Sequence, residues 1–224
     1  MKIPKHIALI PDGNRRWAEE KGLKPWEGHT KGMDTFRDFL DWCYDIGVEE
    51  VTAYSLSKEN FEKRSEEEIH FLFTAYEEKL RGLLTSKDFV EKKIQIRFIG
   101  KKDNLPESVR KLINELEEQS KDFRERKVNL CINYSGREEL LDAAKKISRE
   151  GKEFSAENFE KNLLINDEPD LLIRTAEKRI SNFLLWQSAY SEIHFSPKLF
   201  PEFTKDDLMA AINQYDKTER RYGK

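Results

Sequence analysis

The chain has 224 residues, of which 38% are hydrophobic and 37% charged, and its formal net charge at pH 7 is −3. This length suits one compact domain, spanning residues 1–224, with a sizeable buried core. Nucleic-acid-binding proteins usually carry a basic face, so the charge balance predicts no nucleic-acid partner. The longest apolar runs fall far short of the roughly 20 residues of a membrane span, and the N-terminus lacks a secretory apolar region, so we expect a cytoplasmic protein.

Short β-branched runs alternate with longer amphipathic runs, which is typical of an α/β protein. The first strand is expected over residues 7–10 and the first long helix over 30–46, just before Gly47. Further strands are expected at 51–56, 94–99, 128–132, 171–173 and 192–195, and further helices at 65–84, 106–121 and 137–149. This order predicts a mostly parallel central sheet flanked by helices on both faces.

Polar residues follow four of the expected strands directly, in the segments 11–17, 57–61, 133–137 and 174–181. Ligands of open α/β sheets bind beyond the carboxyl ends of the strands, so these loops form the candidate site. Three of the four segments contain arginine, whose planar fork of donors suits phosphate oxygens. The sequence therefore predicts a diphosphate-binding site, in which Mg²⁺ would link Asp12 to the phosphate oxygens.

Each of these pieces also has an ordinary structural explanation. An isolated Asp-Gly-Asn is usually a turn, Arg174 could be an ion-paired surface residue, and Trp17 is of a residue type found more often in a core than on a substrate. Their recurrence at successive strand ends is what favours a site.

Residues 6–18, His-Ile-Ala-Leu-Ile-Pro-Asp-Gly-Asn-Arg-Arg-Trp-Ala, resemble the first signature of the cis-prenyltransferase family, which includes undecaprenyl and dehydrodolichyl diphosphate synthases. The segments 57–61, 133–137, 170–175 and 179–192 resemble its later signatures, in the same order along the chain. The resemblance implies a Mg²⁺-dependent transferase that condenses isopentenyl diphosphate onto an allylic prenyl diphosphate with cis geometry. Its product would be a polyprenyl diphosphate, with a glycosyl-carrier lipid as the family-based use.

The family fold is an α/β sheet with a hydrophobic tunnel, and the family works as a dimer. The resemblance therefore implies a homodimer, with the subunit contact around residues 183–190. A peripheral membrane contact for product release stays open.

The resemblance assigns the catalytic chemistry to a few side chains. Asp12 would be the catalytic aspartate that acts through Mg²⁺, and Glu192 the second magnesium carboxylate. Asn60 would lie beside the condensing carbons, where the family's asparagine is implicated in proton removal. Because an amide is a weak base, we expect Asn60 to orient the substrate while the released diphosphate accepts the proton.

Substrate binding is implied for residues of three segments. The allylic diphosphate is expected near Gly13, Asn14, Arg15, Arg16 and His29, with Trp17 and Lys24 as further binding residues. Ser57 would accompany Asn60, and Lys58, Glu59, Phe61 and Arg64 would complete this part of the site. Isopentenyl diphosphate is expected at Arg174, Arg179, Ile180 and Ser181.

The sequence departs from the family pattern in several places. Pro11 stands where the family usually has Met, and Pro25 replaces a basic residue, with Lys24 alongside. The segment after Asn60 is one residue longer, so either Lys63 or Arg64 fills the usual arginine's place, and the following serine favours Arg64. The loop 175–179 is one residue shorter and lacks a glycine, which leaves the role of Glu177 open.

Two other functions remain as alternatives within this fold. Some relatives join two allylic units head to middle, and others are non-catalytic partner subunits of a cis-prenyltransferase complex. The retention of Asn14, Glu59 and Asn60 favours chain elongation, and the retention of Asp12 and Arg16 argues against a partner subunit. The phosphate-binding motifs of nucleotide-binding proteins are absent from the sequence.

Helix 65–84 is the candidate wall of the tunnel, because it is the most apolar amphipathic helix in the chain. Its stripe contains Leu72, Phe73, Tyr76 and Leu80, which are equally suited to an ordinary core. The bulk of these side chains predicts a short or medium-length product.

Overall fold

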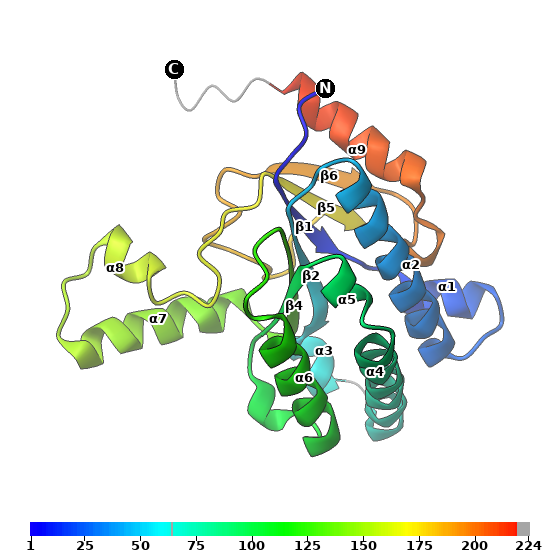
Figure 1. Cartoon of the computed structure of the whole chain (residues 1–224), viewed down its shortest axis with the longest axis horizontal. Helices are drawn as coiled ribbons and strands as arrows, with labels where there is room; N and C mark the ends of the chain where they lie inside the picture. The colour runs from blue at the N-terminus through cyan, green and yellow to red at the C-terminus, as the bar shows by residue number, and fades with distance from the viewer. Residues whose placement is uncertain (64, 219–224) are drawn as a thin grey trace.

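The structure is a computed structural model that describes residues 1–63 and 65–218. Six strands form one sheet in the order β3-β4-β2-β1-β5-β6, with parallel pairing throughout (Figure 1). The strands are β1 His6–Ile10, β2 Glu50–Ser57, β3 Ile94–Ile99, β4 Arg126–Tyr134, β5 Leu171–Thr175 and β6 Glu192–Ser196. The predicted α/β class with a mostly parallel sheet is confirmed.

The helices include the four that the sequence predicts and several shorter ones. They are α1 Asn14–Glu20, α2 Pro25–Asp45, α3 Lys58–Lys63, α4 Glu66–Ser86, α5 Asp88–Glu91, α6 Glu107–Ser120, α7 Gly136–Glu150, α8 Ala156–Glu160 and α9 Lys205–Lys217, with short 3₁₀ turns at Lys102–Asn104 and Phe200–Glu202. Ser65 caps α4 by accepting the Glu68 N–H at 3.2 Å. Among the described residues, none of the helices combines the length and the apolar character needed to cross a bilayer.

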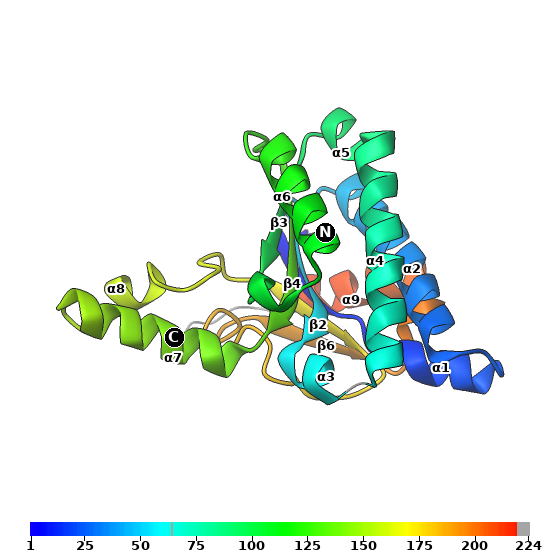
Figure 2. The ribbon, with the colours of Figure 1, turned by 90° about the horizontal axis from the view of Figure 1, so that it is seen from below.

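The two faces of the sheet are covered differently. Alternate strand residues such as Ile7 and Leu9 belong to apolar clusters with α2 and α9, while α4 and α6 cover the strands toward β3. The opposite face buries Ala8 and Ile10 against Phe183 and other residues from the irregular segments. Helices α7 and α8 extend away from the sheet in both ribbon views (Figures 1 and 2).

The parallel arrangement brings the carboxyl ends of all six strands to one edge of the sheet. Strand β1 lies between β2 and β5, and Ile10 is paired with Arg174. The loop that follows β1 therefore starts beside the end of β5, which places Asp12 close to Arg174.

The apolar stripe of α4 is buried as predicted from its spacing. Leu72, Phe73, Tyr76 and Leu80 pack in a cluster with residues of β2, β3, β4 and α6. Phe71 lies outside this stripe, where its half-exposed ring stacks on Trp26 with ring centroids 4.2 Å apart. The tunnel itself stays a prediction.

Candidate active site

The backbone of Asp12 joins the end of β1 to the end of β5. Its N–H donates to Thr175 Oγ1 at 2.9 Å, and its carbonyl accepts a hydrogen bond from the same hydroxyl at 2.7 Å. One carboxylate oxygen of Asp12 accepts the Gly13 N–H at 2.6 Å. Gly13 has a φ of 102°, and a Cβ there would lie 2.7 Å from Leu199 Cδ2, so both conformation and space favour glycine. The Asp12 carboxylate is thus held at a fixed place beside Arg174.

Arg174 is the buried centre of the site, with a side chain only 3% exposed. Its Nη2 donates to Asp12 Oδ2 at 2.8 Å and to Glu177 Oε2 at 3.2 Å. Its Nη1 donates to the Arg179 carbonyl and to Ser181 Oγ. A guanidinium stays charged in a protein, and these four acceptors compensate for its burial.

Glu177 links the two sides of the site. Its carboxylate forms ion pairs with Arg174 and Arg179, and its Oε1 lies 3.5 Å from Nη2 of Arg16. Nη2 of Arg16 also lies 3.7 Å from Asp12 Oδ1. We call these five residues the arginine–carboxylate cluster. Three cations face two carboxylates, so the cluster has an excess positive charge suited to an anionic ligand.

The arginines of the cluster differ strongly in exposure. The side chains of Arg16 and Arg179 are 43% and 64% exposed, in contrast to the buried Arg174. Ser181 adopts a φ of 47°, and its hydroxyl accepts a hydrogen bond from Arg179 Nε at 3.2 Å. The structure therefore brings together Asp12, Arg16, Arg174, Arg179 and Ser181, as the strand-end argument predicts.

The residues after β2 lie beside a hydrogen-bonded hub that the sequence argument missed. Asn182 Nδ2 donates to Glu59 Oε1 at 2.8 Å and to Ser135 Oγ at 2.9 Å, and its Oδ1 accepts the Arg137 N–H at 2.8 Å. These bonds tie together the segments that follow β2, β4 and β5. Its place next to Ser181, in a segment rich in polar strand-end residues, is the signal that could have identified Asn182.

The other predicted residues of this segment have different surroundings. Asn60 is exposed, and its N–H donates to Ser57 Oγ at 3.1 Å. Lys58 forms an ion pair with Glu138 of α7. Phe61 meets Phe73 edge-on, with ring centroids 6.0 Å apart. Arg64 lies outside the described residues.

The predicted residues of α1 and α2 mostly make contacts outside the cluster. Arg15 pairs with Glu19 at 2.9 Å and with Glu68 at 3.5 Å, and Trp17 Nε1 donates to Glu202 at 3.2 Å. The ammonium of Lys24 lies 5.9 Å from the ring centroid of Trp26, and His29 is half-buried. Ile180, which follows β5, packs against the apolar cluster that contains Phe183. Their roles in substrate binding stay predictions.

Comparisons with known proteins identify the family. The sequence model described as "Putative undecaprenyl diphosphate synthase" matches residues 10–223. The chain belongs to this family. It is 42% identical to the tritrans,polycis-undecaprenyl-diphosphate synthase (geranylgeranyl-diphosphate specific) of Methanopyrus kandleri, over all of this chain and 86% of the relative. It is also 42% identical to the isoprenyl transferase of Thermotoga maritima, over all of this chain and 98% of the relative.

Solved structures agree with this assignment to the undecaprenyl diphosphate synthase family. Lavandulyl diphosphate synthase from Lavandula x intermedia, in complex with dimethylallyl diphosphate, superposes with a TM-score of 0.92 at 36% identity, covering 99% of this chain and 98% of that one. A probable undecaprenyl diphosphate synthase from Campylobacter jejuni gives a TM-score of 0.84 at 33% identity, with both chains fully covered.

Glu192 lies at the amino-terminal ends of the strands, whereas Asp12 lies beyond their carboxyl ends. It is the first residue of β6 and is paired with Leu171, whereas Arg174, beside Asp12, is paired with Phe195. Along the strands, three residues separate Glu192 from the level of Arg174 by about 10 Å. Across the sheet, the two strand spacings between β1 and β6 add about 10 Å. Asp12 and Glu192 of one chain are therefore too far apart to bind the same ion, and the role of Glu192 as the second magnesium carboxylate stays a prediction.

Asp12 alone fits a magnesium site of the kind that diphosphate-binding proteins use. Its side chain is 35% exposed, so the carboxylate is accessible from solvent. Mg²⁺ is usually bound by one or two carboxylates together with phosphate oxygens. Within the described part of the chain, no group of three or more acidic, histidine or cysteine side chains is arranged to hold a metal.

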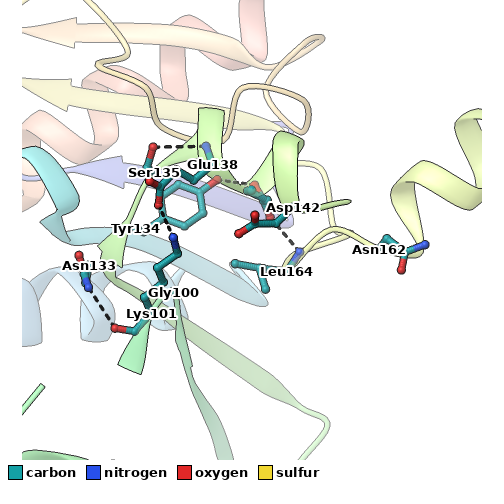
Figure 3. A pocket seen from close by; sticks show the side chains of 10 residues that line it. Gly100, Lys101, Asn133, Tyr134, Ser135, Glu138, Asp142, Asn162 and Leu164 are labelled. Atoms are coloured by element: carbon teal, nitrogen blue, oxygen red, sulfur yellow. Dashed lines mark hydrogen bonds and ion pairs between the residues drawn. The ribbon is translucent and has the colours of Figure 1, made fainter. Parts of the chain in front are cut away.

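A separate cavity of about 130 Å³ lies at the carboxyl ends of β3 and β4 (Figure 3). Tyr134 donates its hydroxyl hydrogen to buried Glu139, which also accepts the Leu164 N–H at 2.9 Å. Burial, with the nearby Glu139 charge, raises the pKa of Tyr134, so the phenol keeps its proton and remains the donor. Asp12 and Arg174 are not among the residues that line this cavity.

Proposed function

We propose that the protein condenses isopentenyl diphosphate onto an allylic prenyl diphosphate with cis geometry. The observation that carries this proposal is the arginine–carboxylate cluster, in which one accessible aspartate and three arginines meet at the carboxyl edge of the sheet. The names of the relatives support the same reaction class, because they include undecaprenyl-diphosphate synthases and isoprenyl transferases.

The cluster supplies two places for diphosphate. Arg174, Arg179 and Ser181 form the proposed site for isopentenyl diphosphate, while Arg16 and Asp12 form the allylic side. Bidentate arginine contacts hold a diphosphate in one orientation, which positions the two reacting carbons. When bound at Asp12, Mg²⁺ would neutralise charge on the departing diphosphate. Asn60 would orient the isopentenyl group, and the released diphosphate would accept the proton.

The regiochemistry is a further part of the proposal that has to be measured. The similar proteins include a lavandulyl diphosphate synthase as well as undecaprenyl diphosphate synthases, so proteins of this fold differ in product. We favour head-to-tail elongation over head-to-middle coupling, because Asn14, Glu59 and Asn60 are present as expected for elongation.

One assay separates these outcomes. The purified protein is incubated with Mg²⁺, labelled isopentenyl diphosphate and a series of primers from dimethylallyl to geranylgeranyl diphosphate, and the extracted products are sized and identified. Elongation gives products that grow by five-carbon units. A branched product from dimethylallyl diphosphate alone would indicate head-to-middle coupling, and absence of any product would indicate a non-catalytic partner subunit.

We further propose a homodimer in which α7 and its neighbouring segments take part. Phe183 and Leu184 are fully buried in the chain's own core, so they cannot form the subunit contact expected around residues 183–190. Leu141 and Tyr190 are 58% and 68% exposed and are better candidates. Light scattering of the wild type and of Leu141→Glu tests this proposal, since a dimer that depends on this face should dissociate in the variant.

The remaining parts of the proposal concern the cell rather than the site. We propose that the protein acts in the cytoplasm as one catalytic domain, touches the membrane only peripherally when it releases product, and supplies a carrier-lipid precursor. Flotation of the protein with lipid vesicles, with and without polyprenyl product, tests the membrane contact.

A further inference from the structure

The side chain of Asn14 is directed into α2. A Cβ at Gly32 of α2 would lie 2.2 Å from Asn14 Oδ1, which locates that oxygen directly against the helix. The amide Nδ2 donates to the Pro11 carbonyl at 3.2 Å. The side chain therefore spans the short distance between α2 and the residue that precedes Asp12.

Two glycines make this approach feasible. Gly28 and Gly32 are both buried and lie one helical turn apart, on the same face of α2. A Cβ at Gly28 would lie 2.1 Å from the backbone oxygen of Asn14. We call the space over these two residues the glycine notch. Its two halves differ, because Gly28 faces the backbone of Asn14 and Gly32 faces its side chain.

The hydrogen bonding of Asn14 is incomplete in a way that points to function. Its Oδ1 is buried, and no group of the described residues donates to it. A buried acceptor without a donor costs stability, so an apolar side chain would suit this notch better if packing were its only role. The amide donor to Pro11 is the compensating feature, and it acts on the loop that carries Asp12.

We propose that Asn14 is a positioning residue whose side chain, seated in the glycine notch, fixes the Asp12 carboxylate through the Pro11 carbonyl without contacting diphosphate. This inference rests on the proposed function, because its kinetic part needs a turnover to measure. It concerns the side chain of Asn14 alone, and it gives Gly28 and Gly32 a defined role. Binding of the allylic diphosphate near Asn14 stays a prediction.

Single substitutions separate positioning from packing. Asn14→Ala removes both the donor and the unpartnered oxygen, so we expect kcat to fall about 10- to 100-fold while the melting temperature changes by less than about 3 °C. The KM for each substrate should stay within about twofold, since no binding contact is lost. A purely structural residue would instead lower the melting temperature with kcat unchanged. A substrate ligand would raise the KM for the primer.

A double-mutant cycle tests the notch itself. Gly32→Ala should lower the melting temperature by about 3–10 °C, because its methyl group collides with the Asn14 side chain. In the Asn14→Ala background, Gly32→Ala should cause no further loss of melting temperature or kcat, since the space is then vacant. Gly28→Ala should remain harmful in both backgrounds, because it meets backbone.

Gly82 provides the matched control. It lies at an exposed position near the C-terminal end of α4, where an added Cβ would have nothing within 4 Å, so Gly82→Ala should raise the melting temperature slightly and leave kinetics unchanged. A Gly32→Ala variant that behaves like Gly82→Ala, or losses at 14 and 32 that simply add, would overturn the proposal. An inactive wild type would refute the proposed function, whereas the melting-temperature cycle would still decide whether Asn14 fills the notch.

Discussion

Replacing Arg174 with alanine should lower both stability and affinity for isopentenyl diphosphate, whereas replacing Arg179 with alanine should lower affinity alone. The difference follows from burial, since the side chains are 3% and 64% exposed. Arg174 is held by four acceptors within the protein, while Arg179 is largely in water. A diphosphate would contact both guanidinium groups, but only one of them supports the fold.

The magnitudes can be worked from these contacts. Breaking a buried ion pair by removing one partner costs about 3–5 kcal/mol. The partner carboxylates of Arg174, on Asp12 and Glu177, are 35% and 27% exposed, so solvent recovers part of this cost. We therefore expect a loss of about 2–4 kcal/mol, or about 4–16 °C in melting temperature for a chain of this size. The exposed pair of Arg179 contributes about 0–1 kcal/mol.

Steady-state kinetics with each substrate varied in turn provide the second measurement. A lost charge-assisted hydrogen bond of about 1.5–3 kcal/mol should raise the KM for isopentenyl diphosphate by about 10- to 100-fold in both variants. Arg16→Ala should raise the KM for the primer instead. Arg37→Ala, at a side chain 73% exposed on α2, is the control and should change neither. Equal effects of the three cluster substitutions on both substrates would refute the two-site assignment.

Three further outcomes are expected. Asp12→Ala should abolish turnover, as should EDTA, with the fold retained; activity without divalent metal would contradict a role for Asp12 in magnesium binding. Phe73→Ala should lengthen the product if Phe73 limits the growing chain, and an unchanged product size with a lower melting temperature would make it ordinary core. Burial lowers the pKa of His6 below its ordinary value of 6.5. The carboxylate of Glu50, 3.8 Å away, opposes this shift but does not cancel it. The folded protein then binds fewer protons than the unfolded chain below about pH 6.5, so stability falls as pH decreases there, and His6→Gln should flatten that fall in thermal unfolding; parallel curves would contradict this.

The regular elements with strong apolar patterning could be predicted from sequence. The β3 strand has the predicted bounds, and α4 begins where Ser65 and its acidic first turn indicate a cap. The short helices α1 and α3 were not predicted, because seven and six residues are too few to establish a helical period. The α9 helix was missed although Thr204 and Asp207 form a capping box, a signal that is readable from sequence.

The site was predictable in outline and not in detail. Strand-end reasoning predicts that Asp12 and Arg174 meet, because it needs only that β1 and β5 are parallel neighbours. The place of Glu192 depends on the register of β6, which no local pattern fixes, so its distance from Asp12 could not be predicted. The direction of Asn14 depends on the glycines of α2, which lie in another element.

Glu177 allows three arginines to lie close together in the cluster, a role that the loop sequence alone did not reveal. In a site without substrate, three arginines at the same edge of the sheet would repel one another, and each would sample many rotamers. The Glu177 carboxylate contacts all three, and Asp12 contacts two of them. The guanidinium groups are therefore held near one another before diphosphate arrives, so less side-chain entropy is lost on binding. Because Arg16 and Arg179 are exposed, they can exchange a carboxylate partner for a phosphate oxygen. The buried Arg174 keeps its contacts with Asp12 and Glu177, which holds the two proposed diphosphate sites in place relative to each other.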